Sequence, residues 1–112
     1  MIHHPPTRSG ASYGRGLRDA RSFEKVIAKH GADLVLHGHN HRQSVVKIKG
    51  PEGEVPVVGV ASASAVPGSP NHRAAYHLYR IERENGRAAI MMQVRGLLPS
   101  GAIGDVGTER LV

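Results

Sequence analysis

The sequence predicts a mixed α/β (α+β) fold in which one βα unit leads into a run of antiparallel strands. Three observations support this class. One segment near the start has apolar residues at helical spacing, and a short apolar run, Asp33–His37, follows it. The rest of the chain shows strand-like segments separated by glycine-rich turns.

The βα unit begins with Met1–His4, an extended segment that Pro5 and Pro6 end, because proline cannot donate to a strand ladder. Residues 7–16 are rich in glycine and serine and predict a loop. A helix is expected over about Leu17–His30, with Gly31 as its C-cap. Its apolar face comprises Ala20, Phe23, Val26 and Ile27. A basic stripe, which we expect to be solvated, comprises Arg18, Arg21, Lys25 and Lys29.

After the buried strand Asp33–His37, four more strands are expected: Gln43–Ile48, Val55–Ala61, Ala74–Glu82 and Arg87–Arg95. Asn85-Gly86 is a strong signal for a two-residue hairpin between the last two. One face of the final strand should be buried, at Ala88, Ile90, Met92 and Val94. We predict that residues 1–95 form one part of a domain and that residues 96–112 are a glycine-rich, mobile tail.

Composition limits the possible functions. The 112 residues include no Cys, which excludes disulfides and thiolate metal sites, and no long apolar run, so we expect a cytoplasmic protein with no membrane partner. The net charge of +6 favours anionic partners such as phosphate esters; nucleic acid fits the charge, but no motif supports it. With one Phe and no Trp, the core is small for an independent domain. We therefore expect assembly, either with a second copy or with a missing N-terminal half.

The sharpest chemical feature is Gly38-His39-Asn40-His41. In an extended segment, side chains two residues apart point to the same side, roughly 6.6 Å apart along the chain. Two such imidazoles can each hold one of two metals separated by about 3.5–4 Å, or share one metal. Two surface histidines in a turn are the alternative for this motif taken alone.

A second histidine pair, His3-His4, stands at the end of another expected strand. A βα crossover makes the two strands parallel, so their carboxyl ends meet at one edge of the sheet. His3 or His4 can therefore converge there with His39 and His41. Neutral imidazole suits zinc, iron and similar divalent ions.

These motifs resemble the closing motifs of the calcineurin-like metallophosphoesterases: His-His-Pro-Pro at residues 3–6, a helix, an apolar strand and Gly-His-Asn-His. Residues 58–65 and 76–81 also resemble the final strands of the class III cyclic-nucleotide and glycerophosphodiester phosphodiesterases. The resemblance covers most of residues 1–95. It implies the C-terminal part of a four-layer αββα sandwich that holds two divalent metals, Mn, Fe or Zn.

The resemblance also implies roles for single residues. His3 and His39 would bind one metal and His41 the other, while His4 would lie behind the ligands or face the phosphate. The family's Asp-x-His, Gly-Asp-x-x-Asp and Gly-Asn-His-Asp/Glu motifs precede the first of these histidines and are absent from this chain. Three neutral histidines cannot offset the charge of two divalent cations. We therefore expect the C-terminal part of a longer enzyme, with negligible activity by itself.

Simpler interpretations suit the other candidate residues. His37 shares the register of His39, which leaves open a role in supporting the ligands, but we expect a packed strand histidine there. His77 should lie on a strand face, and His30 near a helix C-terminus, where positive charge is favourable. Ser62, Ser64 and His72 are weak candidates for contact with a phosphate. Two functions stay open: metal-dependent hydrolysis of phosphate esters by the full-length protein, or a non-catalytic metal- or anion-binding interaction module.

Overall fold

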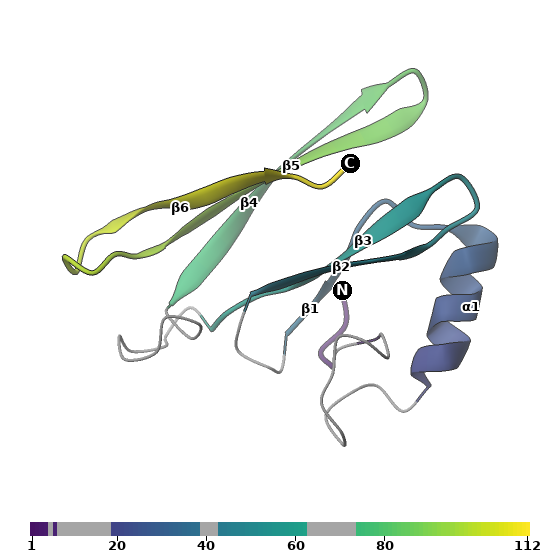
Figure 1. Ribbon diagram of the computed structural model, residues 1–112, viewed down its shortest axis with the longest axis horizontal. Coiled ribbons are helices and arrows are strands. Elements are labelled where there is room, and N and C mark those ends of the chain that lie inside the picture. The colour runs from purple at the N-terminus through teal and green to yellow at the C-terminus, as the bar shows by residue number, and fades with distance from the viewer. Residues whose placement is uncertain (5, 7–18, 39–42, 63–73) are drawn as a thin grey trace. The chain divides into compact units, whose positions relative to one another are not determined.

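The computed structural model describes residues 1–4, 6, 19–38, 43–62 and 74–112 (Figure 1). The chain divides into two compact units, Met1–Val60 and Ala61–Val112. Within the described residues, the first unit has one helix and a three-stranded sheet, and the second has another three-stranded sheet. The predicted α+β class is confirmed. No helix in these ranges is long and apolar enough to cross a membrane.

The sheet of the first unit has the strand order β1-β3-β2. Its elements are helix α1 (Ala20–His30) and strands β1 (Val35–His37), β2 (Ser44–Lys49) and β3 (Glu54–Gly59). Strands β1 and β3 are parallel, whereas β2 and β3 are antiparallel. Ile2 forms an isolated parallel bridge with His37, so the start of the chain runs alongside β1. This is the parallel βα arrangement that the sequence predicted.

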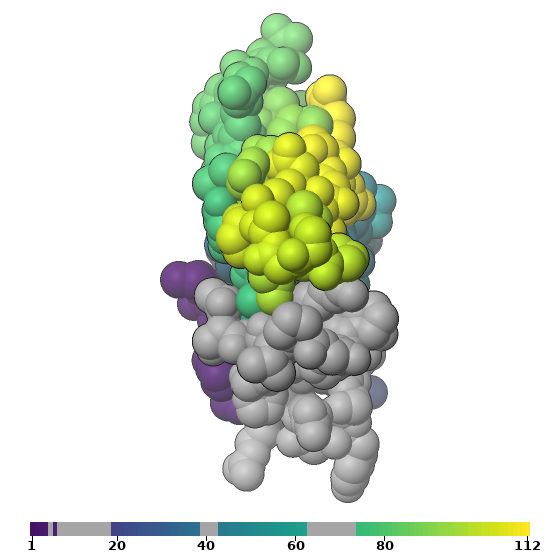
Figure 2. Space-filling view, turned by 90° about the vertical axis from the view of Figure 1, so that its left-hand side faces the viewer, coloured from purple at the N-terminus to yellow at the C-terminus, as the bar shows by residue number. Residues whose placement is uncertain are grey.

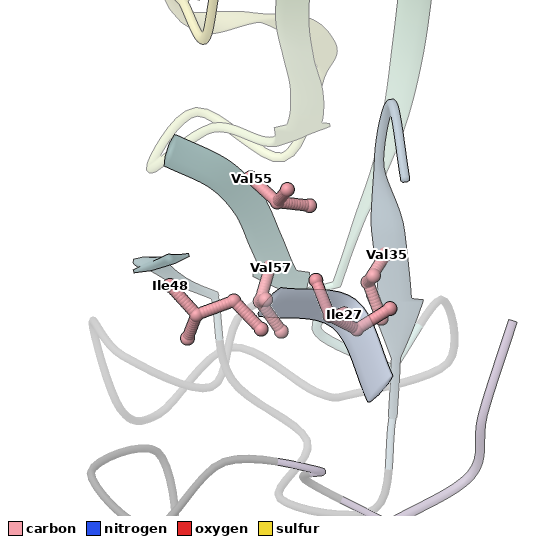
Figure 3. Close-up of a cluster of buried hydrophobic side chains, with 5 residues drawn as sticks. All are labelled: Ile27, Val35, Ile48, Val55 and Val57. Carbon is pink, nitrogen blue, oxygen red and sulfur yellow. The ribbon is translucent and has the colours of Figure 1, made fainter. Parts of the chain in front are cut away.

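Aliphatic side chains build the core of this unit. Ile27 of α1 packs with Val35, Ile48, Val55 and Val57 of the three strands (Figure 3). The strand residues among them share one face of the sheet. Val35 pairs with Val57, Ile48 pairs with Val55, and Val55 and Val57 stand two residues apart on β3. Helix α1 therefore covers this face. The central strand β3 is buried along most of its length, as expected for a strand flanked on both sides.

The helix differs from the expectation in one respect. Ala20 and Ile27 are buried and Phe23 packs against the core, but Val26 is 54% exposed. The prediction that Val26 belongs to the buried apolar face was wrong. The sheet contacts a narrower stripe of the helix than the four apolar positions span. The C-cap was correct: Gly31 has φ +78° and its N–H donates to the Ile27 carbonyl at 2.8 Å.

The second unit is an antiparallel meander of β4 (Ala75–Glu84), β5 (Arg87–Leu97) and β6 (Ile103–Arg110). Asn85 and Gly86 join β4 to β5 with φ of 53° and 79°, the geometry of the two-residue hairpin expected from the sequence. On β5, Ile90, Met92 and Val94 are buried, which confirms these positions of the predicted face, whereas Ala88 is half-buried.

Strand β6 corrects the expectation of a structureless tail after residue 95. It pairs with β5 from Met91↔Arg110 to Leu97↔Ile103, with an irregularity between Val94 and Arg95. Most of its residues are exposed, and its yellow-green to yellow atoms lie on the face shown in Figure 2. The sequence concealed this strand because its stability comes from backbone pairing with β5, while its own glycines and exposed polar residues give no alternating pattern.

Candidate functional site

Backbone pairing places His3 beside the beginning of the Gly-His-Asn-His motif. The Ile2 N–H donates to the Leu36 carbonyl at 2.8 Å, and the Gly38 N–H donates to the His3 carbonyl at 3.0 Å. The segment carrying His3 and the carboxyl end of β1 therefore lie side by side. Sites in open α/β sheets are formed at such strand ends.

The imidazoles of His3 and His4 lie together at this edge. Their ring centroids are 4.8 Å apart, and the rings meet edge to face at 87°. Both residues are exposed. Each also makes further contacts within the protein.

His39 and His41 lie outside the described residues, so the convergence of three imidazoles stays a prediction. The described residues contain no group of three His, Asp or Glu side chains that could hold a metal ion. The donors predicted from the sequence are neutral imidazoles, which suit zinc or iron but leave most of the charge of two cations uncompensated. These histidines therefore fit a two-metal centre as part of its ligands, without the negative charge that such a centre needs.

Among the described residues at the same edge, His37 is buried. Its side chain is 5% exposed, and its Nδ1 lies 3.3 Å from the Gly38 carbonyl oxygen, which accepts a hydrogen bond in the tautomer that carries the proton on Nδ1. Burial lowers the pKa of His37, and the hydrogen bond to Gly38 opposes that effect only in part. The expectation of a packed strand histidine is confirmed.

The sequence analysis did not single out two neighbours of His37. Gly59 ends β3 and is paired with His37 on one side and with Ser44, the first residue of β2, on the other. A Cβ on Gly59 would lie 2.5 Å from Ser44 Oγ and 2.8 Å from His37 Cε1. The available signal was a glycine directly after the apolar run of residues 55–58, since glycine in a strand often marks a close approach.

A second histidine with an altered pKa lies in the other unit. His77 Nδ1 is 2.8 Å from the Tyr79 hydroxyl, and the two rings meet at 76°. Burial lowers the pKa of His77 and raises the pKa of Tyr79 to about 12, so both groups are neutral at pH 7. His77 Nε2 is buried and has no hydrogen-bond partner among the residues that the structure describes. As expected, His77 is a strand-face residue.

Of the weaker phosphate-contact candidates, Ser62 is half-buried, whereas Ser64 and His72 lie outside the described residues. Asp105, the acidic residue near the middle of β6, has partners within the second unit. Its carboxylate forms an ion pair with Arg95 at 2.9 Å and accepts a hydrogen bond from Gln93 at 2.6 Å. This aspartate thus has partners of its own on β5.

Comparison with known proteins supports the fold assignment. No protein-family model matches the chain, and no curated protein matches its sequence. Among solved structures, the chain is similar to a double mutant of Vps29 from Entamoeba histolytica, with a TM-score of 0.59 and 16% identity over 89% of this chain and 50% of that chain. Wild-type Vps29 complexed with Zn²⁺, from the same organism, gives a TM-score of 0.56 and 18% identity, over 99% of this chain and 52% of that chain.

Vps29 has a calcineurin-like metallophosphoesterase fold. The present chain spans about half the length of the Vps29 chains that it matches. At this level of identity the similarity concerns the fold alone. The architecture of this chain, with its two sheets and one helix in the described residues, is therefore that of part of a metallophosphoesterase-like fold.

Proposed function

We propose that the protein to which this chain belongs hydrolyses phosphate esters, in particular phosphodiesters, at a centre of two divalent metal ions. The observation that carries the proposal is the backbone pairing of His3 with Gly38, the residue before His39. The sequence resemblance to class III phosphodiesterases supports it. The metallophosphoesterase-like fold is shared with Vps29, which has been crystallised with Zn²⁺.

When bound, the two metals would polarise the phosphoryl group and make a water acidic enough to attack it. In this proposal His3 and His39 hold one metal, Mn, Fe or Zn, through neutral imidazole nitrogens, and His41 holds the other. His4, whose ring meets that of His3, supports this site or faces the phosphate. Carboxylates from an upstream half would complete the centre, because imidazoles contribute no negative charge.

The second candidate is a non-catalytic module that binds a metal or an anion. It is favoured by the net charge of +6, which attracts anions. The two proposals differ in a simple way. An enzyme requires the missing carboxylates, whereas a module can bind a single ion or an anionic partner without them.

Hydrolysis of a generic phosphodiester with Mn²⁺ tests the proposal. The 112-residue chain should show weak metal binding and negligible turnover, while a longer protein that includes an upstream half should be active and inhibited by a chelator. His39→Ala or His41→Ala in the longer protein should abolish turnover. His30→Ala, at the exposed end of α1, is the matched control and should leave it unchanged.

Robust, chelator-sensitive hydrolysis by the 112-residue chain alone would contradict the division of ligands between two halves. An inactive longer protein that binds one metal with full affinity would favour the module. Assembly with an upstream half or with a second copy belongs to the same proposal. The cytoplasmic location expected from the sequence stays a prediction.

A further inference from the structure

The peptide groups on both sides of Gly38 are held by hydrogen bonds. Its N–H donates to the His3 carbonyl at 3.0 Å, and its carbonyl oxygen lies 3.3 Å from Nδ1 of the His37 ring. The Gly38 carbonyl belongs to the peptide group that leads directly into His39. A side chain that holds this carbonyl in place therefore also fixes the plane of the peptide group that joins Gly38 to the next residue.

Because glycine has few steric limits on its backbone angles, hydrogen bonds are needed to hold the backbone at Gly38 in one conformation. Without a Cβ, Gly38 has access to a wider range of backbone angles than any other residue. The described residues on either side of the motif are ordered parts of one sheet: His37 ends β1 and Ser44 begins β2. The orientation of the chain where it leaves β1 thus depends on what holds the Gly38 peptide groups.

The His37 ring occupies space that Gly59 leaves empty. A Cβ on Gly59 would lie 2.8 Å from Cε1 and 3.2 Å from Nε2 of the ring, and 2.5 Å from the Ser44 hydroxyl oxygen. Both distances to the ring are shorter than ordinary van der Waals contact. The glycine at the end of β3 therefore leaves room for the ring in the position where its Nδ1 lies 3.3 Å from the Gly38 carbonyl oxygen.

We propose that His37 is a positioning residue: through the hydrogen bond from Nδ1 to the Gly38 carbonyl, and with Gly59 as the space that admits its ring, it orients the backbone entering His39. The consequence for metal binding rests on the proposed function, in which His39 is a ligand. The orientation of Gly38 does not depend on that function.

The composition of this face supports a role beyond packing. His37 lies on the same side of its strand as Val35, and the cross-strand neighbours on that side include Val57 and Ile48 of the aliphatic core. A branched aliphatic side chain would fill this position without the penalty of burying a polar ring. A polar contact offsets that penalty, and the ring makes one through Nδ1 with the Gly38 carbonyl oxygen. Groups that orient metal ligands typically change metal affinity by about 10–100-fold when they are lost.

Two substitutions of His37 separate positioning from packing. His37→Leu keeps the bulk of the side chain but removes the donor. His37→Asn loses bulk but keeps a side-chain N–H two bonds from Cβ, where Nδ1 stands in histidine. Gly59→Ala provides an independent perturbation, because its new methyl group would displace the ring.

The experiment titrates Zn²⁺ into the full 112-residue chain and follows amide resonances by NMR, which measures weak affinities well. His37→Leu and Gly59→Ala should weaken Zn²⁺ binding about tenfold, and His37→Asn less than about twofold. Two controls should stay within about twofold of the parent chain. Ile48→Ala destabilises the same sheet away from the motif, and Gly107→Ala adds a methyl group to a strand glycine that has no atom within 4 Å of its would-be Cβ.

Hydrogen exchange of the Gly38 amide is the second readout, and it requires no metal. His37→Leu should accelerate this exchange more than Ile48→Ala does, while His37→Asn should not. Weaker Zn²⁺ binding in the asparagine variant than in the leucine variant would overturn the proposal and assign His37 to packing. If the parent chain binds no Zn²⁺, or binds it equally well after His39→Ala, the proposed function fails for this chain, and Gly38 exchange alone decides whether His37 positions the backbone.

Discussion

Val57 and Val26 allow the same chemical change to be made at a buried and at an exposed position. Val57 lies on the central strand at 1% exposure among the core residues of the first unit, whereas Val26 on α1 is 54% exposed. Val57→Ala removes two buried methyl groups, about 1.6 kcal/mol of transfer free energy, to which the cavity adds a further term. We expect the free energy of unfolding to fall by about 2–3 kcal/mol.

Val26→Ala should change the free energy of unfolding by less than about 0.5 kcal/mol, because the small loss of burial is offset by the better helix propensity of alanine. Urea unfolding of each variant of the 112-residue chain, followed by circular dichroism at one temperature, measures both values. The packing of α1 described above would be refuted if Val26→Ala were as destabilising as Val57→Ala, since Val26 would then belong to the core.

Three further predictions concern the second unit. Gly86→Ala should lower the free energy of unfolding by about 1 kcal/mol, because Gly86 has φ +79°, whereas Gly107→Ala, with open space around it, should have a smaller effect in the same urea titration. Burial lowers the pKa of His77 below its usual 6.5, so the unfolded chain takes up the proton first as the pH falls. Stability should therefore decline below about pH 6.5, and more gently in His77→Gln; equal slopes in the two proteins would contradict the burial of this ring. The ion pair between Arg95 and Asp105 is largely exposed, and a double-mutant cycle should give a coupling of less than about 1 kcal/mol that shrinks in high salt.

The fold was predictable where local chemistry determines it. Asn85-Gly86 specified a hairpin through its tolerance of positive φ, and the alternation after residue 87 specified the buried face of β5. Two features were not predictable from local patterns. Strand β6 depends on its pairing with β5, and the exposure of Val26 depends on how much of the helix the sheet contacts. Both are tertiary effects, which periodicity in a single segment does not contain.

For the candidate site, the sequence predicted which segments meet but not what supports them. The βα connection implied parallel strands with adjacent carboxyl ends. The hydrogen bond from the Gly38 N–H to the His3 carbonyl joins the two segments at these ends. Gly59 lies between His37 on one neighbouring strand and Ser44 on the other, and a Cβ on Gly59 would meet both side chains. Only the strand order β1-β3-β2 brings these residues into one row, and spacing along the chain does not specify that order.

The bridge between Ile2 and His37 also has a consequence for the folding rate. It joins the second residue of the chain to the end of β1. A long loop that includes α1 must therefore close, at a cost in chain entropy, before this pairing contributes any stability. The β4–β5 hairpin closes through two residues and can form within microseconds. We expect the amides of β4 and β5 to gain protection from hydrogen exchange early in refolding, and the amide of Ile2 to be among the last. The edge of the sheet that carries His3 would then be the slowest part of the first unit to assemble.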